Sequence, residues 1–447
     1  MQWIKTNAMK PIPVDSASGE RPDIGHRSTR PVGRHGLLWE AGRAFGGPGR
    51  AGRTARFAAI SGGGTASHAL LTVAVARALV ARGLEPGSLQ LIGSKRGREE
   101  SVMAGQGFPL LRLSGRGLRR GRAAAHLPRN LAAVAGLAWA SLRAFATFLR
   151  HRPRVVVGTG GYASLAAGLA AAALRIPLVL LNADVEPGLA NRVLGRVADA
   201  CAVANPGTRL PHAVVTGVPL RPQVLAVRRT PESRRRARSA LGIPEGRRTV
   251  CFAGGSLGAL RINQAAASLA QRWSAREDLA IYHVTGRRDY EEVAGSAAGG
   301  PGGAGGPAAP GARGLWRQVV SFQDHMEDLY EAADVMVCRA GAMTVAELAA
   351  AGVPSVLIPL AGAPRDHQTK NARVLERAGA AVLVPDPECQ PARLESVLDE
   401  LLGDPARLDA MADAARGLGH RVDHRRAAAR IAELVCQVAG GRCGVSC

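Results

Sequence analysis

The sequence predicts an α/β fold with two doubly wound, Rossmann-like domains. Short, fully apolar runs alternate with longer helical segments along most of the chain, which is the pattern of a parallel sheet covered by helices on both faces. The alternation occurs in two successive series. Each series begins with a strand that runs into a glycine-rich turn, first at 62–64 and again at 254–258. We therefore expect two such domains facing a cleft.

The first series of elements occupies residues 56–220. Its predicted strands are Phe57–Ile60, Leu89–Ile92, Val155–Val157 and Pro177–Leu181. Its predicted helices include Leu70–Arg82 and Leu131–Arg150. An arginine-rich polar stretch, 222–248, then marks a domain boundary. The second domain is expected over 221–420, with a flexible insertion at about 294–315 that is rich in Gly, Ala and Pro.

The ends of the chain have a different composition from the two domains. Residues 1–55 are rich in Gly, Pro, Arg and Ser without periodicity, and we expect a disordered basic extension there. Residues 421–437 predict a helix that packs back on the first domain, and 438–447 form a tail.

The stretch 333–371 carries the clearest signal for chemistry. The buried strand Val335–Val337 leads into small residues at 340–342, and a helix follows. Thr344 with Glu347 three residues later indicates a capping box at its start, and Gly352 ends the helix. A strand, a tight turn and a helix N-terminus together make an anion site, because unpaired N–H groups and the helix dipole favour negative charge.

The composition narrows the classes of partner. The formal net charge is +23, carried almost wholly by arginine. Such a protein can attract nucleic acid, anionic lipid or phosphorylated substrates. The interleaving of aromatic and basic residues typical of single-strand binders is missing, and there is no zinc-finger spacing, so we expect no nucleic acid partner. The apolar run Leu131–Leu142, between Arg129 and Arg143, is too short to span a bilayer.

Three motifs permit more than one interpretation. Gly158–Ala163 matches the dinucleotide fingerprint G-x-G-x-x-A, with Asp184 after the next strand, which favours a dehydrogenase. His68 follows the first glycine-rich turn, where it is either a general base or a structural residue. Glu347 is either the partner of Thr344 in a capping box or a ligand for a hydroxyl group.

A basic run lies beside an apolar helix in the first domain. Its arginines are Arg112, Arg116, Arg119, Arg120 and Arg122, and the helix carries Trp139, Phe145 and Phe148. This combination is typical either of contact with anionic lipid or of a solvated loop beside a core helix.

Taken together, the motifs resemble those of the MurG family, bacterial transferases that add N-acetylglucosamine to undecaprenyl-pyrophosphoryl-muramoyl-pentapeptide. The resemblance covers roughly residues 56–437. It is carried by GGGTASH (62–68), GTGGYAS (158–164), PGLANR (187–192), TGVPLR (216–221), GGSLGALRIN (254–263), CRAGAMTVAELAAAGVPSVLIP (338–359) and DHQTKNARVLERAGAA (366–381).

The resemblance implies the GT-B architecture, with the sugar nucleotide bound mainly by the second domain. It implies that the donor, UDP-N-acetylglucosamine, contacts Arg221, Ser256, the Ala342-Met343-Thr344 turn, Glu347 and Gln368. It assigns the acceptor, a lipid-linked muramoyl-pentapeptide, to Gly64, Thr65, Ser67, Gly161, Tyr162 and Asn191. It also implies a catalytic role for His68, with Asp184 as the nearby carboxylate.

The departures from the family pattern lie mostly on the acceptor side. Ala66-Ser67 replaces the family's Gly-Gly, and Leu181–Asp184 replaces its His-Glu-Gln-Asn. Leu257 stands where the family has Gln, and Val218 where it has Asn. Donor recognition is thus expected to be retained more completely than acceptor recognition.

The sequence therefore predicts an inverting glycosyltransferase that uses no metal or other cofactor, because it contains no Asp-x-Asp in a strand-end context to hold a divalent ion. It is expected to act at the cytoplasmic face of the bacterial plasma membrane, attached peripherally to an anionic membrane surface. The alternatives are a related enzyme with another lipid or glycan acceptor, a nucleotide-binding scaffold without turnover, and the dehydrogenase.

Overall fold

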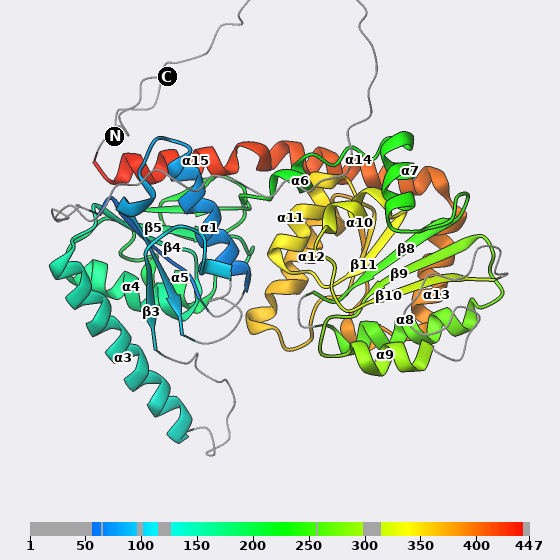
Figure 1. The fold of residues 1–447 in the computed structure, drawn as a ribbon, viewed down its shortest axis with the longest axis horizontal. Helices are drawn as coiled ribbons and strands as arrows, with labels where there is room; N and C mark the ends of the chain where they lie inside the picture. Colours follow the sequence, from blue (N-terminus) through cyan, green and yellow to red (C-terminus); the bar gives the residue numbers. More distant parts are fainter. Residues whose placement is uncertain are drawn as a thin grey trace, which may run out of the picture. The chain divides into compact units, whose positions relative to one another are not determined.

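The computed structural model contains two parallel sheets, each with helices on both faces, so the predicted fold class is confirmed (Figure 1). It describes residues 56–63, 66–95, 102–114, 127–255, 258–297 and 314–440. The predicted disordered extension over 1–55 lies outside the described residues, as do most of the predicted insertion and of the tail.

The first sheet has seven strands in the order β3-β2-β1-β4-β5-β6-β7, all parallel. These strands are β1 (Ala58–Ser61), β2 (Leu89–Ser94), β3 (Leu110–Leu113), β4 (Val155–Gly158), β5 (Leu178–Asn182), β6 (Ala200–Val203) and β7 (Ala213–Val215). The helices between them are α1 (Ala66–Val80), α3 (Leu127–Arg150), α4 (Gly161–Ala173) and α5 (Leu189–Leu194), and a 3-10 turn, η1 (Pro86–Ser88), precedes β2.

The second sheet has six parallel strands in the order β10-β9-β8-β11-β12-β13. These are β8 (Arg248–Ala253), β9 (Leu279–Val284), β10 (Trp316–Val320), β11 (Val335–Cys338), β12 (Ser355–Leu357) and β13 (Ala381–Leu383). The helices are α6 (Pro222–Leu225), α7 (Pro231–Ala240), α8 (Leu260–Arg272), α9 (Tyr290–Ala297), α10 (Met326–Ala332), α11 (Ala342–Ala351), α12 (His367–Arg377), α13 (Pro391–Gly403), α14 (Pro405–Val422) and α15 (His424–Val438), with 3-10 turns η3 (Pro364–Asp366) and η4 (Asp386–Glu388).

The alternation of side chains along each strand divides each core into two layers. In β1, Ala58 and Ile60 join the layer that contains α1, whereas Ala59 joins the layer beneath α3 and α4. In β8, Cys251 faces α7 and α10, and Phe252 faces α8 and α13. Strands buried on both faces explain the continuous apolar runs in the sequence.

The last helix, α15, packs on the first sheet rather than on the second. Ile431, Ala432 and Val435 are fully buried in the same cluster as Leu71 of α1. Figure 1 shows α15, in red, beside α1, although α14 immediately before it packs on α11 of the second domain. The carboxyl-terminal segment therefore connects both cores.

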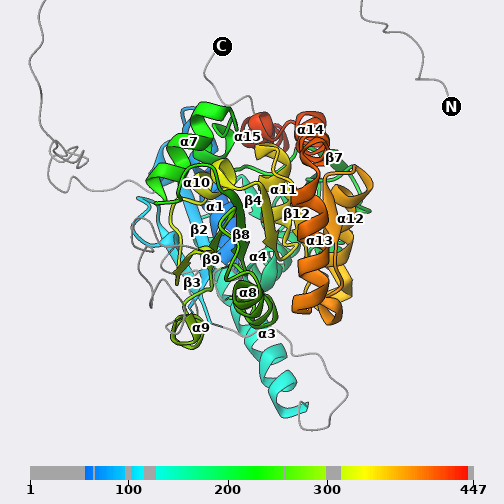
Figure 2. The same cartoon turned by 90° about the vertical axis from the view of Figure 1, so that its right-hand side faces the viewer.

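The predicted helix Leu131–Arg150 is present as α3, which begins four residues earlier, at Leu127. The apolar run Leu131–Leu142 was expected to be too short to span a bilayer, but 132–150 is long and apolar enough to cross a membrane by length and composition. That expectation was wrong because exposed Arg143 does not end the apolar segment. One face, with Ala140, Ala144 and Phe148, is buried. The amino-terminal end of α3 extends away from the first sheet in both views (Figures 1 and 2).

Candidate functional site

The second sheet reverses its direction of growth between β8 and β11, and a crevice of about 960 Å³ lies at the carboxyl ends of these two strands. In an open parallel sheet this reversal leaves a gap between the connecting helices, where ligands bind. The crevice walls include Gly254, Gly255, Gly258, Gly341, Thr344 and Gln368. Two of the predicted donor contacts, Thr344 and Gln368, therefore lie on one crevice.

The turn after β8 requires glycine. Gly255 and Gly258 both have φ of +81°, and a Cβ atom on Gly258 would lie 2.4 Å from the carbonyl oxygen of Thr285. Helix α8 begins after Ala259, and no described side chain caps its first N–H groups. They are therefore available to an anion in the crevice. The predicted contact Ser256 falls outside the described residues.

Helix α11 begins three residues earlier than the predicted capping box requires. Gly341 is the N-cap residue, and no described side chain accepts a hydrogen bond from the first turn. Thr344 and Glu347 lie inside the helix, so the capping-box prediction was wrong. Glycine at the N-cap has no side chain to accept a hydrogen bond, so the N–H groups of Ala342, Met343 and Thr344 find no side-chain cap among the described residues. These groups begin the helix at the crevice.

Glu347 lies one turn further along α11, in a cluster that also contains predicted Arg221. The Tyr330 hydroxyl donates to Glu347 Oε2 at 2.7 Å, and Arg221 Nη2 lies 3.9 Å from Oε1. Arg221 is equally close to Glu327, with Nη1 3.9 Å from Oε2. Burial raises the pKa of the Glu347 carboxyl above its usual range. The structure thus brings Arg221 and Glu347 together, and Thr344, one turn before Glu347 on α11, lines the crevice.

Gln368, at the start of α12, is fixed by its side-chain carbonyl. Its Oε1 accepts a hydrogen bond from the backbone N–H of Leu360 at 2.9 Å, which leaves the Nε2 amide as a donor at the crevice. The preceding residues Arg365 and Asp366 both have positive φ, at 57° and 55°. Two consecutive non-glycine residues with left-handed backbone angles indicate a strained loop, and such strain is often found at binding sites.

Three arginines of the crevice were missed by the sequence analysis. Arg261, Arg288 and Arg339 all line it. Arg339 pairs with Asp386, whose second oxygen lies 3.4 Å from Arg261 Nε. Arg339 directly follows β11, so its place at a strand end was a signal available in the sequence. Arg261 was concealed within a helix and Arg288 in a loop among many other arginines.

The first sheet has a corresponding reversal between β1 and β4, and His68 lies there in the first turn of α1. The imidazole lies against the turn after β4: a Cβ on Gly160 would be 2.8 Å from Nε2, and one on Gly161 would be 1.4 Å from the Gly63 carbonyl oxygen. Burial lowers the pKa of His68, and the Asp184 carboxylate opposes this shift. The imidazole is therefore neutral near pH 7 and able to accept a proton.

Asp184 reaches the second domain. Its Oδ1 accepts a hydrogen bond from Asn371 Nδ2 of α12 at 2.8 Å, and the Asn371 Oδ1 accepts from the Val185 backbone N–H at 2.9 Å. Glu186 pairs with Arg365 and Lys370. The segment after β5 thus joins the His68 turn to the helix that carries Gln368.

The remaining predicted acceptor residues have varied surroundings. The Tyr162 hydroxyl donates to the carbonyl oxygens of Ser114 and Gly136, at 3.0 and 2.5 Å, which ties α4 to α3. Asn191 is buried and donates to Leu181 and Asn182, while its Oδ1 has no partner among the described residues. Ser67 is exposed on α1. Gly64 and Thr65 lie outside the described residues.

Within the part of the chain that the structure describes, no three His, Cys, Asp or Glu side chains gather as a metal site would require. The charged side chains of the crevice at β8 and β11 are Arg261, Arg288, Arg339 and Asp386.

Comparison with known proteins identifies both halves of the chain. The model of the "Glycosyltransferase family 28 N-terminal domain" matches residues 58–203, and that of the "Glycosyltransferase family 28 C-terminal domain" matches residues 249–432.

Relatives of similar length carry a more specific name, UDP-N-acetylglucosamine--N-acetylmuramyl-(pentapeptide) pyrophosphoryl-undecaprenol N-acetylglucosamine transferase. One from Desulforudis audaxviator is 34% identical and the match covers 80% of this chain and 93% of the relative. One from Mycobacterium bovis is 35% identical over 86% of this chain and 89% of the relative. The crystal structure of Acinetobacter baumannii MurG is similar with a TM-score of 0.63, at 28% identity, over 82% of this chain and 98% of that one.

The turn after β8 makes a direct stability prediction. Gly258→Ala places a methyl group 2.4 Å from a backbone oxygen, whereas Gly255→Ala has the same φ but open space. We expect Gly255→Ala to lower the free energy of unfolding by about 1 kcal/mol, and Gly258→Ala by at least about 2 kcal/mol more. Urea unfolding of both variants measures the difference. Equal losses would contradict the close approach of the turn to Thr285.

Proposed function

The chain belongs to glycosyltransferase family 28, and we propose that it transfers N-acetylglucosamine from UDP-N-acetylglucosamine to an undecaprenyl-pyrophosphate-linked muramoyl-pentapeptide. The names of the relatives that match four-fifths of the chain support this reaction. The structural observation that carries it is the crevice at β8 and β11, which is bordered by two helix N-termini without side-chain caps. Family membership also favours this function over the dehydrogenase.

We propose that the donor diphosphate binds at the start of α8 and α11. Backbone N–H groups and helix dipoles stabilise anions there, and Arg261, Arg288 and Arg339 add positive charge. Negative charge increases on the diphosphate as the bond to the sugar breaks. The same groups therefore stabilise the departing UDP, and we propose that they do so without a metal ion.

We propose that Glu347 accepts hydrogen bonds from the ribose hydroxyls. Its Oε2 already accepts from Tyr330, which fixes the carboxylate, and Arg221 favours its charged form. We assign the sugar itself to Gln368, whose Nε2 amide faces the crevice that would hold the diphosphate.

The reaction we propose is a single displacement with inversion. The acceptor hydroxyl loses its proton and attacks the anomeric carbon, while the bond from that carbon to the diphosphate oxygen breaks and UDP leaves. We assign the proton to His68, since its imidazole is neutral near pH 7 and lies at the turn of Gly160 and Gly161. Asp184 supports the imidazolium that forms, through its charge.

We propose that the exposed face of α3 contacts the membrane surface peripherally. Val134, Trp139, Leu142 and Leu149 are 55–65% exposed, and Arg143 and Arg150 are exposed on the same helix. The opposite face packs into the core of the first domain. The helix therefore cannot span a bilayer without unfolding that core. We place this contact at the cytoplasmic face, where a nucleotide sugar and a lipid-linked acceptor are both accessible.

One observation favours a second candidate, the same transfer to another lipid or glycan acceptor. Leu181–Asp184 differs from the family's His-Glu-Gln-Asn, and Asn182 and Asp184 are both engaged in hydrogen bonds, to Asn191 and Asn371. Radiolabel transfer to the muramoyl-pentapeptide lipid and to a panel of other lipid acceptors separates the two functions.

The proposed base predicts a pH dependence of transfer. The rate with radiolabelled UDP-N-acetylglucosamine should be constant above neutrality and should decrease as the pH falls through the lowered pKa of His68, below 6.5. His68→Gln should reduce the rate by about 10²–10⁴-fold and remove this decrease.

His151→Gln, which replaces an exposed histidine after α3, is the matched control and should leave the profile unchanged. A His68→Gln enzyme with the wild-type rate and acid limb would remove His68 from the mechanism.

The ribose assignment predicts a difference between two carboxylates. Glu347→Gln should weaken UDP binding about tenfold, because a charged acceptor is lost. Glu327→Gln removes the same charge at the same 3.9 Å from Arg221 and should change the affinity less than about twofold. Isothermal titration calorimetry measures both. If the two variants lose affinity equally, Glu347 acts through Arg221 and not on the nucleotide.

The membrane proposal is tested with vesicles that contain phosphatidylglycerol. Replacing Trp139 and Leu142 together by Ser should reduce sedimentation with the vesicles at least about tenfold, since two apolar side chains no longer enter the interface. Leu169→Ser, at a 38% exposed position on α4, is the control and should have little effect. Unchanged sedimentation of the double variant would exclude α3 as the contact.

A further inference from the structure

A second cavity lies in the same domain as the donor crevice, but at the opposite end of its sheet. It has a volume of about 270 Å³, and its walls include Arg248, the first residue of β8, together with Asp334 and Pro354, which directly precede β11 and β12. The donor crevice follows the carboxyl ends of β8 and β11. A six-residue strand is about 20 Å long, so the two sites are separated by the length of the sheet.

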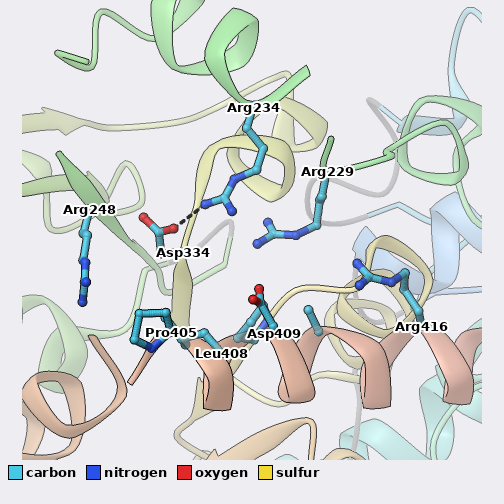
Figure 3. Close-up of a pocket in the computed structure, with 10 residues that line it drawn as sticks. Arg229, Arg234, Arg248, Asp334, Pro405, Leu408, Asp409 and Arg416 are labelled. Carbon is cyan, nitrogen blue, oxygen red and sulfur yellow. Dashed lines mark hydrogen bonds and ion pairs between the residues drawn. The ribbon is translucent and has the colours of Figure 1, made fainter. Parts of the chain in front are cut away.

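Four arginines line this cavity, and we call it the arginine pocket: Arg229, Arg234, Arg248 and Arg416. Figure 3 shows the guanidinium groups of Arg229 and Arg234 above α14, with Arg248 and Arg416 on either side. They come from the segment before α7, from α7, from β8 and from α14. Elements distant in the sequence therefore bring the four side chains around one space.

The carboxylates of the arginine pocket do not balance this charge. Only Asp334 and Asp409 line it. Both oxygens of Asp334 are already occupied, because Oδ1 pairs with Arg234 and Oδ2 accepts from Arg238 at 2.7 Å and from the Thr249 N–H at 2.6 Å. Asp409 forms no ion pair with any residue that the structure describes. Arg416 also pairs with Asp413, which lies outside the walls. The four guanidinium groups still outnumber these three carboxylates, so the arginine pocket keeps an excess of positive charge.

Several donors in the arginine pocket have no acceptor. Arg234 Nε is buried and finds no hydrogen-bond partner among the described residues. The Arg248 guanidinium pairs with no described carboxylate within the range of an ion pair. Among the described residues, the Arg229 guanidinium donates to the carbonyl oxygen of Tyr330 alone. Arg248 is exposed, so water can reach its donors, whereas the buried Arg234 Nε is left without an acceptor. Because an unpaired buried donor destabilises a protein, an anion that accepts from Arg234 would be bound favourably.

The electrostatics of Arg229 agree with this geometry. The pKa of its guanidinium is lowered to about 9, mainly by burial and then by the charges of Arg234 and Arg416, while Asp334 and Glu331 oppose this shift. The group is still charged at pH 7. A bound anion would relieve the repulsion among these cations, which is a favourable contribution to binding.

We propose that the arginine pocket binds a soluble phosphate-class oxyanion, of the size of inorganic pyrophosphate. Guanidinium groups pair with phosphoryl oxygens through two parallel hydrogen bonds, which a planar fork of donors favours over a single point charge. A water molecule occupies about 30 Å³, so a cavity of about 270 Å³ holds a group several times larger. Such an anion would bind together with a donor nucleotide and would not compete with it.

The test is calorimetric titration of the full chain with pyrophosphate at constant ionic strength, with and without saturating UDP. The variant carries Arg248→Gln and Arg416→Gln. Among the described residues, the one ion pair that these two native arginines form is that of Arg416 with Asp413. We expect pyrophosphate affinity at this site to fall at least about tenfold. Thermal unfolding without ligand checks that the variant is folded.

Arg407→Gln is the matched control. Arg407 lies on α14 with Arg416, pairs with Glu400 and does not line the pocket, so the substitution removes the same charge from the same helix. We expect Arg407→Gln to change pyrophosphate affinity less than about twofold. We also expect pyrophosphate binding that depends on Arg248 and Arg416 to persist when UDP is present at saturation.

Three results would overturn the proposal. The first is an equal loss of pyrophosphate affinity in the Arg407 variant and the double variant. The second is competition between UDP and pyrophosphate, and the third is the absence of saturable pyrophosphate binding to the wild-type chain. The first would indicate general attraction to a chain of net charge +23, and the second would assign the anion to the donor crevice. If the chain bound no UDP at all, the proposed transferase function would fail while the Arg248- and Arg416-dependent binding would still be measurable.

Discussion

The uncapped N-termini of α8 and α11 are the feature on which the rest of the site depends. Each follows a strand at the point where the second sheet reverses its direction, so the N–H groups of both helices point to one crevice. Side-chain caps would satisfy these groups and close the site to an anion. Glycine at 341 and the glycine turn before Ala259 leave them available, and this accounts for the small residues that precede both helices.

Each sheet reverses its direction of growth once, and a candidate site lies at each reversal. At the reversal of the first sheet, α1 and α4 begin beside His68, Gly160 and Gly161, where we place the acceptor and the base. We place the donor at the reversal of the second sheet. Contacts between Asp184 and Asn371, and between Glu186 and Arg365, link the acceptor-side segment to the helix that carries Gln368.

Sequence patterns predicted the fold class well because each central strand is buried on both faces and reads as an apolar run. The short strands β3, β6 and β10 were missed; β6, for example, consists of Ala200-Cys201-Ala202-Val203, which lacks the branched residues typical of strands. The helix start at Gly341 was missed because Thr344 and Glu347 imitate a capping box, while a glycine N-cap leaves no side-chain signal.

The family resemblance pointed to Arg221, Glu347, Thr344 and Gln368. In the structure Thr344 and Gln368 line the crevice at β8 and β11, and Arg221 lies 3.9 Å from Glu347. The arginine pocket had no such signal. Its four members are separated by up to 187 positions and stand among 54 arginines in a chain with four lysines, so that only the folded arrangement distinguishes them.

A crystal structure of the chain with UDP-N-acetylglucosamine tests the account most directly. It should show diphosphate oxygens within hydrogen-bond distance of the first N–H groups of α11, with the ribose at Glu347 and no metal ion between the phosphates and the protein. A diphosphate bound away from both helix N-termini, or one held chiefly by a coordinated cation, would contradict it.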